Sequence, residues 1–237
     1  YDLTDHQIDL LTEQHARHIL ASQYEDTLTA IRWHNRLQNL AERLPFAIPV
    51  NISSDPRHGV VDSSMEYKGT GLNVSWWPEG IGLSASFEPE LCRAFSETAS
   101  KEYRALGIAT ALGPQIDLAT DPRWMRATDS FGGLLSMTKD MAKAYCDGLQ
   151  TTADAPYGWG RDSVIAMAKH WPGGGTGEGG RDAHYPFGKY AVYPGGRFNE
   201  HMKPFLEGAM DLPGKTRQCA AVMPYYTISW DQDESYH

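Results

Sequence analysis

Residues 164–175 read Val-Ile-Ala-Met-Ala-Lys-His-Trp-Pro-Gly-Gly-Gly, an apolar run that ends in two ionisable side chains. A short apolar run bounded by Gly and Pro is typical of a strand buried on both faces. Lys169 and His170 stand at its carboxyl end, which is where α/β barrels carry their reactive groups. The simpler alternative is that these two side chains cap the strand and pair with surface carboxylates.

Three further apolar runs, at 46–53, 108–119 and 220–226, also end in charged or aromatic residues. Helical spacing of apolar residues predicts helices over 5–20, 26–44, 89–106, 134–150 and 198–210. Strands that alternate with helices favour βα units around a parallel sheet. We therefore expect an α/β fold of the (β/α)8 TIM-barrel type. A doubly wound sheet would also place ligands at its carboxyl edge, but no Gly-x-Gly-x-x-Gly motif opens a helix after a strand here.

The composition narrows the class of function. The chain has 237 residues and a formal net charge of −9, with no run of Lys and Arg, so a nucleic-acid partner is not expected. No apolar stretch reaches the roughly 18 residues of a membrane span, so we expect no membrane partner. Cysteines at 92, 146 and 219 lack metal-type spacing, and we expect neither a metal site nor a cofactor.

Several charged side chains would meet at the top of such a barrel, and we expect five of them to converge there: Asp55, Arg123, Arg126, Lys169 and His170. A carboxylate accepts hydrogen bonds from neighbouring hydroxyls, whereas Lys, Arg and His donate to the same ligand. Seven Trp and twelve Tyr could add flat walls suited to a sugar ring. The structural alternatives are that Asp121 is a turn residue and that Arg123 pairs with Asp117.

Four segments together resemble the glycoside hydrolases of family 3. Lys169-His170-Trp-Pro-Gly is similar to the family's Lys-His-Phe-x-Gly motif, and Asp121-Pro-Arg-Trp-Met-Arg126 to its Asp-Pro-Arg-Trp-Gly-Arg signature. Asp55-Pro-Arg-His58-Gly resembles its Ile-Asp-x-x-His-Gly, and residues 78–91 resemble the segment before its next helix. Two departures are Met125 in place of the signature Gly, and Asp129 with Gly133-Leu134 in place of Glu and Glu-Asp.

The resemblance implies an N-terminal (β/α)8-type barrel over residues 1–237, followed in the family by an α/β sandwich domain on the same polypeptide. It implies a retaining, exo-acting β-glucosidase that cleaves β-linked oligosaccharides or glycosides through a covalent glycosyl-enzyme. By matching position, the residues expected to bind the sugar in the −1 subsite are Asp55, Arg126, Lys169, His170, Met223 and Tyr226. Such an enzyme is expected to be secreted or periplasmic, although no signal peptide is visible in the sequence.

The catalytic nucleophile of the family is the Asp of a Ser-Asp-Trp motif, which this sequence lacks. Ser229-Trp230-Asp231 has the wrong order, so we expect the nucleophile beyond His237 and interpret the chain as truncated before that strand. The acid/base Glu of many members would lie further on as well. A barrel without its last strands would leave open edges.

Three alternatives stay open. In the β-N-acetylglucosaminidase branch an Asp-x-His dyad supplies the acid/base, and Asp182-Ala-His184 resembles it, although Gly174 replaces the loop histidine of that branch. A β-xylosidase is the second alternative. The third is a degenerate barrel that binds sugar without catalysis.

Overall fold

The computed structural model describes residues 2–22, 26–55, 58–59 and 73–232. Its α-helices are α1 (Asp5–Thr12), α2 (Thr27–Ala41), α3 (Gly80–Ser84), α4 (Pro89–Leu106), α5 (Leu135–Gln150) and α6 (Phe198–Lys203). Its strands are β1 (His18–Leu20), β2 (Asn51–Ser54), β3 (Thr110–Ala111), β4 (Ile165–Trp171), β5 (Tyr190–Ala191), β6 (Ala221–Pro224) and β7 (Ile228–Ser229). Short 3-10 turns occur at Pro45–Ala47, Ala127–Asp129, Glu178–Gly180 and Pro186–Gly188, and a π-helical turn at Pro204–Ala209.

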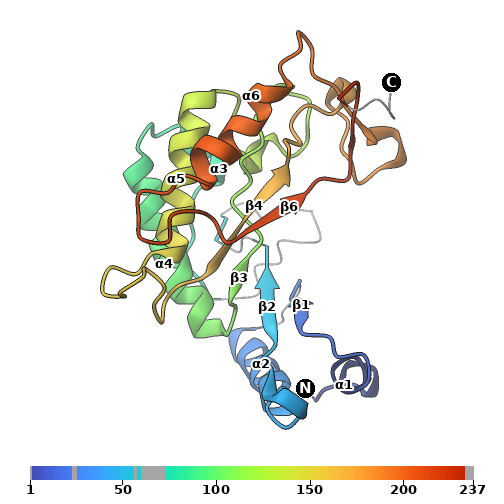
Figure 1. Ribbon diagram of the computed structural model, residues 1–237, viewed down its shortest axis with the longest axis vertical. Helices are drawn as coiled ribbons and strands as arrows, with labels where there is room; N and C mark the ends of the chain where they lie inside the picture. The colour runs from blue at the N-terminus through green and yellow to red at the C-terminus, as the bar shows by residue number, and fades with distance from the viewer. Residues whose placement is uncertain (1, 23–25, 56–57, 60–72, 233–237) are drawn as a thin grey trace.

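One parallel sheet organises the chain, with its strands in the order β1-β2-β3-β4-β6 (Figure 1). The order follows the sequence, whereas a doubly wound sheet would reverse direction at a switch point. When each new parallel strand is added on the same side of the one before it, the sheet curls into part of a barrel. The expected α/β barrel class is confirmed, and the described residues form a parallel half-barrel. A separate pair, β5 and β7, adds a small second sheet.

The helix predicted over 5–20 is wrong in its second half. α1 ends at Thr12, and His15 adopts a left-handed backbone conformation with φ of 56°. Residues 18–20 instead form β1, which pairs in parallel with 51–53 of β2. A strand of three residues is too short to show a period of its own, so its sheet partner decides its conformation.

Helix α4 has the predicted bounds because both of its ends carry strong signals. Pro89 occupies the first turn, where its missing N–H needs no partner, and Gly107 closes the helix at φ of 85°. Its buried face packs against α5, with the rings of Phe95 and Tyr145 5.3 Å apart. Figure 1 shows these two helices side by side against the sheet.

Other predicted elements are also shorter than expected. The run 46–53 forms strand only from Asn51, because residues 45–47 form a 3-10 turn. The run 108–119 forms hydrogen-bonded strand only at β3, and its continuation pairs with β4 through an isolated bridge between Gln115 and Lys169. The helix predicted over 198–210 changes at Pro204 from α6 to the π-helical turn, because proline lacks the N–H of a regular helix.

The parallel strands bring their carboxyl ends to a single edge of the sheet. Asp55 follows β2, Asp117 follows β3, His170 lies near the end of β4 and Tyr226 follows β6. In the described part of the chain, no helix is both long and apolar enough to cross a membrane.

Candidate active site

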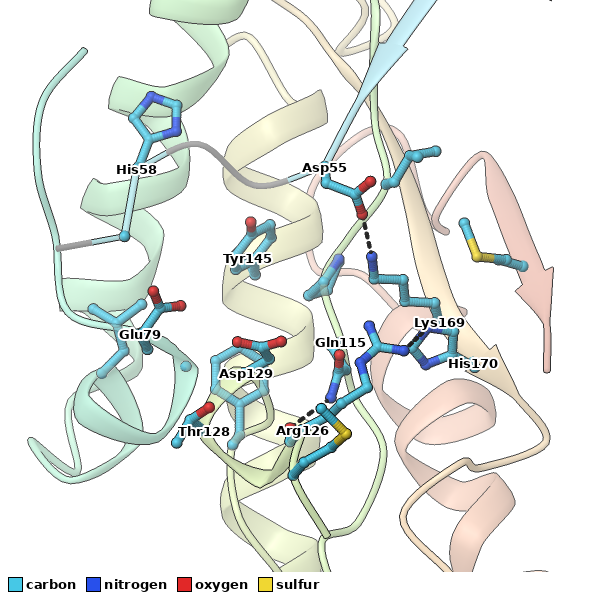
Figure 2. A pocket seen from close by; sticks show the side chains of 18 of the residues that line it. Asp55, His58, Glu79, Gln115, Arg126, Thr128, Asp129, Tyr145, Lys169 and His170 are labelled. Carbon is cyan, nitrogen blue, oxygen red and sulfur yellow. Dashed lines mark hydrogen bonds and ion pairs between the residues drawn. The ribbon is translucent and has the colours of Figure 1, made fainter. Parts of the chain in front are cut away.

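A cavity of about 610 Å³ lies at the carboxyl edge of the sheet. This volume falls in the usual range for small-molecule sites. All six predicted sugar-binding residues line it: Asp55, Arg126, Lys169, His170, Met223 and Tyr226. Figure 2 shows the polar members on one side of the cavity, with Glu79, Asp129 and Tyr145 across from them.

Lys169 and Asp55 form an ion pair across β3. The Lys169 Nζ atom lies 2.7 Å from Asp55 Oδ1, and the two side chains are 5% and 19% exposed (Figure 2). Burial lowers the pKa of Lys169, and the nearby Arg126 lowers it too, while Asp55 opposes both. The Asp55 carboxylate therefore pairs with the buried ammonium of Lys169, and part of the carboxylate stays accessible from the cavity.

His170 is held by the buried carboxylate of Asp117. Its Nδ1 lies 2.8 Å from Asp117 Oδ2, and its backbone N–H donates to Oδ1 at 3.0 Å. The N–H of Gly174 donates to the same Oδ1 atom. Burial raises the pKa of Asp117, but the contacts with His170 and Gly174 together lower it more, so the net shift is downward.

Arg126 approaches the other nitrogen of the same imidazole. Its Nη1 atom lies 3.1 Å from His170 Nε2, and because a guanidinium can only donate, Nε2 acts as the acceptor. His170 is thereby assigned as neutral, with its proton on Nδ1. Burial lowers the pKa of His170, Arg126 and Lys169 lower it further, and Asp117 opposes them.

The prediction that Arg123 joins this cluster is wrong. Its side chain is 72% exposed and pairs with Asp121 at 2.7 Å, and it is not among the cavity-lining residues. The pairing of Arg123 with Asp117 is also wrong, because Asp117 engages His170. Asp121 is a turn residue, since its Oδ1 accepts the backbone N–H of Arg123 at 2.9 Å.

Asp182 and His184 also face the cavity. His184 Nδ1 lies 2.6 Å from Asp182 Oδ1, and Trp124 and Tyr225 donate to Oδ2 at 3.3 and 3.4 Å. Burial raises the pKa of Asp182, but hydrogen bonds from His184 lower it more. A Cβ atom on Gly174 would lie 2.7 Å from Cε1 of Tyr225, so the loop histidine expected for the dyad branch would clash with this ring in its present position.

Sequence reasoning missed two residues of this site, Gln115 and Asp117. They are isolated polar residues two positions apart in the apolar run 108–119, so in extended backbone they share one face. Buried polar residues need partners, and that spacing was the available signal. His58, from the motif that begins at Asp55, lines the cavity and pairs with Glu102 at 2.7 Å; residues 56 and 57 lie outside the described residues.

The described residues contain no group of three or more His, Cys, Asp or Glu side chains arranged to hold a metal ion. The three cysteines are free and buried, and burial raises the pKa of each thiol. The polar groups of the cavity are hydrogen-bond donors and acceptors suited to a neutral, hydroxyl-rich ligand.

The profile of the glycosyl hydrolase family 3 N-terminal domain matches residues 3–223. The chain belongs to glycosyl hydrolase family 3. Family 3 relatives include "Probable beta-glucosidase C" of Aspergillus flavus, 40% identical over 223 residues, which cover 92% of this chain and 33% of the relative. A "Periplasmic beta-glucosidase/beta-xylosidase" of Dickeya chrysanthemi is 40% identical over 198 residues, covering 82% of this chain and 28% of the relative. The chain thus spans about a third of the length of these family 3 proteins.

Two solved structures share the fold. The β-N-acetylglucosaminidase from Paenibacillus sp. str. FPU-7 superposes with a TM-score of 0.75 at 23% identity, covering 95% of this chain and 39% of that one. The exo-1,3/1,4-β-glucanase from a Pseudoalteromonas species superposes with a TM-score of 0.74 at 20% identity, covering 94% and 27%. Of the residues that depart from the family 3 pattern, Met125 and Asp129 line the cavity, whereas Gly133 and Leu134 are not among its lining residues.

Proposed function

We propose that this chain forms the sugar-binding part of a β-glucosidase that releases glucose from the non-reducing ends of β-linked oligosaccharides or glycosides. The observation that carries the proposal is the buried Lys169–Asp55 pair, which faces the same cavity as Arg126 and His170. Relatives named as β-glucosidases at 40% identity support the same activity.

The chemistry of the cavity suits a pyranose in the −1 subsite. Asp55 can accept hydrogen bonds from vicinal hydroxyls, whereas Lys169 and Arg126 can only donate to them. Met223 and the exposed ring of Tyr226 supply apolar wall for the C–H faces of the ring. In this proposal these residues, with His170, orient the sugar and do not react with it.

Retaining hydrolysis needs two carboxylates about 5–5.5 Å apart, one of them a nucleophile. Because residues 1–237 contain no Ser-Asp-Trp, we assign the nucleophile and the acid/base to sequence outside them. We accordingly propose that residues 1–237 are the N-terminal barrel domain of a longer polypeptide that includes an α/β sandwich domain. The shorter length of the chain relative to its relatives supports this arrangement.

The test is hydrolysis of aryl β-D-glucoside, β-D-xyloside and β-D-N-acetylglucosaminide by the full-length protein. We expect the glucoside to have the highest kcat/KM, with release of β-glucose. Lys169→Met is expected to remove most of the activity toward the glucoside. A full-length protein that binds glucose but lacks both Ser-Asp-Trp and turnover is instead a degenerate sugar-binding barrel.

A β-N-acetylglucosaminidase is the second candidate, because His184 Nδ1 lies 2.6 Å from Asp182 Oδ1 beside the cavity. The clash that a side chain at Gly174 would meet with Tyr225 weighs against it. Preference for the N-acetylglucosaminide, together with loss of activity in His184→Ala and rescue by azide, would establish the dyad. Activity of His184→Ala on the glucoside without azide supports the first candidate.

A β-xylosidase is the remaining alternative, and the name of the Dickeya relative includes that activity. We also propose that the protein acts outside the cytoplasm, as a periplasmic or secreted enzyme, as the name of the same relative suggests. Higher kcat/KM on the xyloside would support the xylosidase, and cell fractionation with a cytoplasmic marker tests the location.

A further inference from the structure

Gln115, a residue of the cavity wall, carries an orphaned acceptor. Its side chain lines the cavity and the residue is only 5% exposed. Its Oε1 atom is buried and has no hydrogen-bond partner among the residues that the structure describes. A buried acceptor without a donor is unfavourable by about 1–3 kcal/mol, so this atom needs a donor from outside the described residues, and a ligand in the cavity can supply one.

The orientation of this carboxamide follows from its other end. Gln115 Nε2 donates to the backbone carbonyl of Arg126 at 3.0 Å. A flipped amide would set Oε1 against that carbonyl, which also only accepts, so the assignment of oxygen and nitrogen is determined. Figure 2 shows the oxygen turned away from the Arg126 carbonyl.

Gln115 also stands next to the proposed sugar-binding groups. It is the bridge partner of Lys169 across neighbouring strands, so both side chains leave the same face of the sheet. Lys169 and Arg126 can only donate hydrogen bonds, whereas Gln115 Oε1 can only accept them. A ligand group that lies between them must accept and donate at once.

We propose that Gln115 binds one ring hydroxyl of the substrate through Oε1 and selects for that hydroxyl. A hydroxyl donates to Gln115 while it accepts from Lys169 or Arg126. A carboxylate or phosphate at this position cannot donate, so a uronide or sugar phosphate that carries its charge there is disfavoured. The proposal rests on the proposed glycosidase function and adds a specificity-determining residue to it.

The test is a double-mutant-type cycle in the full-length protein, in which the side chain of residue 115 and one substrate hydroxyl are removed singly and together. The substrates are aryl β-D-glucoside and its 2-, 3-, 4- and 6-deoxy analogues. Gln115→Met removes the acceptor at similar volume. For one hydroxyl, we expect its deletion to reduce kcat/KM by about 3- to 10-fold more in the unsubstituted protein than in Gln115→Met, the worth of a neutral hydrogen bond. Gln14→Met, the same substitution at an exposed residue outside the cavity, should leave all four penalties unchanged.

Equal penalties in the unsubstituted protein and Gln115→Met, for every hydroxyl, would overturn the proposal and leave Gln115 bound to water only. Failure of the proposed function is separate, because it appears as absence of turnover on the parent glucoside. Should Gln115→Met fail to fold, the crystal structure of the full-length protein with glucose decides. A sugar hydroxyl within about 3.2 Å of Oε1 supports the proposal, and a water there contradicts it.

Discussion

Arg126 and His170 fix each other's hydrogen-bonding roles: the guanidinium Nη1 lies 3.1 Å from the imidazole Nε2, on the opposite side of the ring from Asp117. One nitrogen of the ring faces a donor and the other faces a carboxylate. The neutral Nδ1–H form satisfies both, whereas a protonated ring would place an N–H against the guanidinium.

A pH dependence follows from this arrangement. The pKa of His170 is lowered from 6.5 by burial, so the unfolded state binds the proton more readily than the folded state. The contribution of His170 to stability is therefore intact above pH 6.5 and is lost as the pH falls from 6.5 toward the folded-state pKa. Urea unfolding measured across this pH window should show that the free energy of unfolding falls more steeply with falling pH in the unsubstituted protein than in His170→Gln. Equal slopes in the two proteins would contradict the prediction.

Substitution of Asp117 should disturb the orientation of His170. Asp117→Asn replaces one acceptor oxygen with a donor, and we expect the free energy of unfolding to fall by about 1.5–3 kcal/mol, the worth of a hydrogen bond to a charged group. Imidazole ¹⁵N shifts should report loss of the Nδ1–H form. Asp121→Asn is the matched control, because the Asp121–Arg123 pair is solvent-exposed and its loss should leave unfolding nearly unchanged.

The two partners of the Lys169–Asp55 pair should respond unequally. Asp55→Ala leaves the ammonium of Lys169, 5% exposed, without its carboxylate, and we expect a loss of about 3–5 kcal/mol in unfolding free energy. Lys169→Met leaves Asp55, which reaches the cavity, and should be less destabilising. Both variants should lose glucose affinity by calorimetry. The reverse order of stabilities would show that the buried charge is compensated elsewhere.

Gly174 should tolerate no side chain while Tyr225 is present. A Cβ at 174 would lie 2.7 Å from Cε1 of Tyr225, whose ring is 4.7 Å from the ring of His170. We expect Gly174→Ala to weaken glucose binding, and its effect to shrink in a Tyr225→Ala background. Gly196→Ala, where a Cβ meets nothing within 4 Å but the backbone φ is 69°, should lower stability without affecting glucose binding. Additive effects of the substitutions at 174 and 225 would argue against the clash.

The sequence predicted the elements whose ends are marked by strong local signals. Helix α4 lies between a proline and a left-handed glycine, and its bounds follow from residues 89–107 alone. The strands β1, β5 and β7 have two or three residues each, so no periodicity can reveal them, and their pairing depends on distant segments. Short strands of this kind are decided by tertiary contacts.

The same distinction applies to the site. The six proposed sugar-binding residues were found from motifs, and they share one cavity. Arg123 was misplaced because the turn set by Asp121 directs its side chain into solvent, which its proximity to Arg126 in sequence does not reveal. Gln115 and Asp117 were missed because their partners, Arg126 and His170, are 11 and 53 residues away.

Asp117 accepts an N–H from β4 and another from the loop that follows it, at His170 and Gly174. A side chain that follows β3 thus anchors both the end of β4 and the first residues of that loop. Insertions or replacements past residue 177 can accumulate during evolution while the imidazole keeps its orientation. New substrate preferences can therefore be selected in the loop without rebuilding the strand.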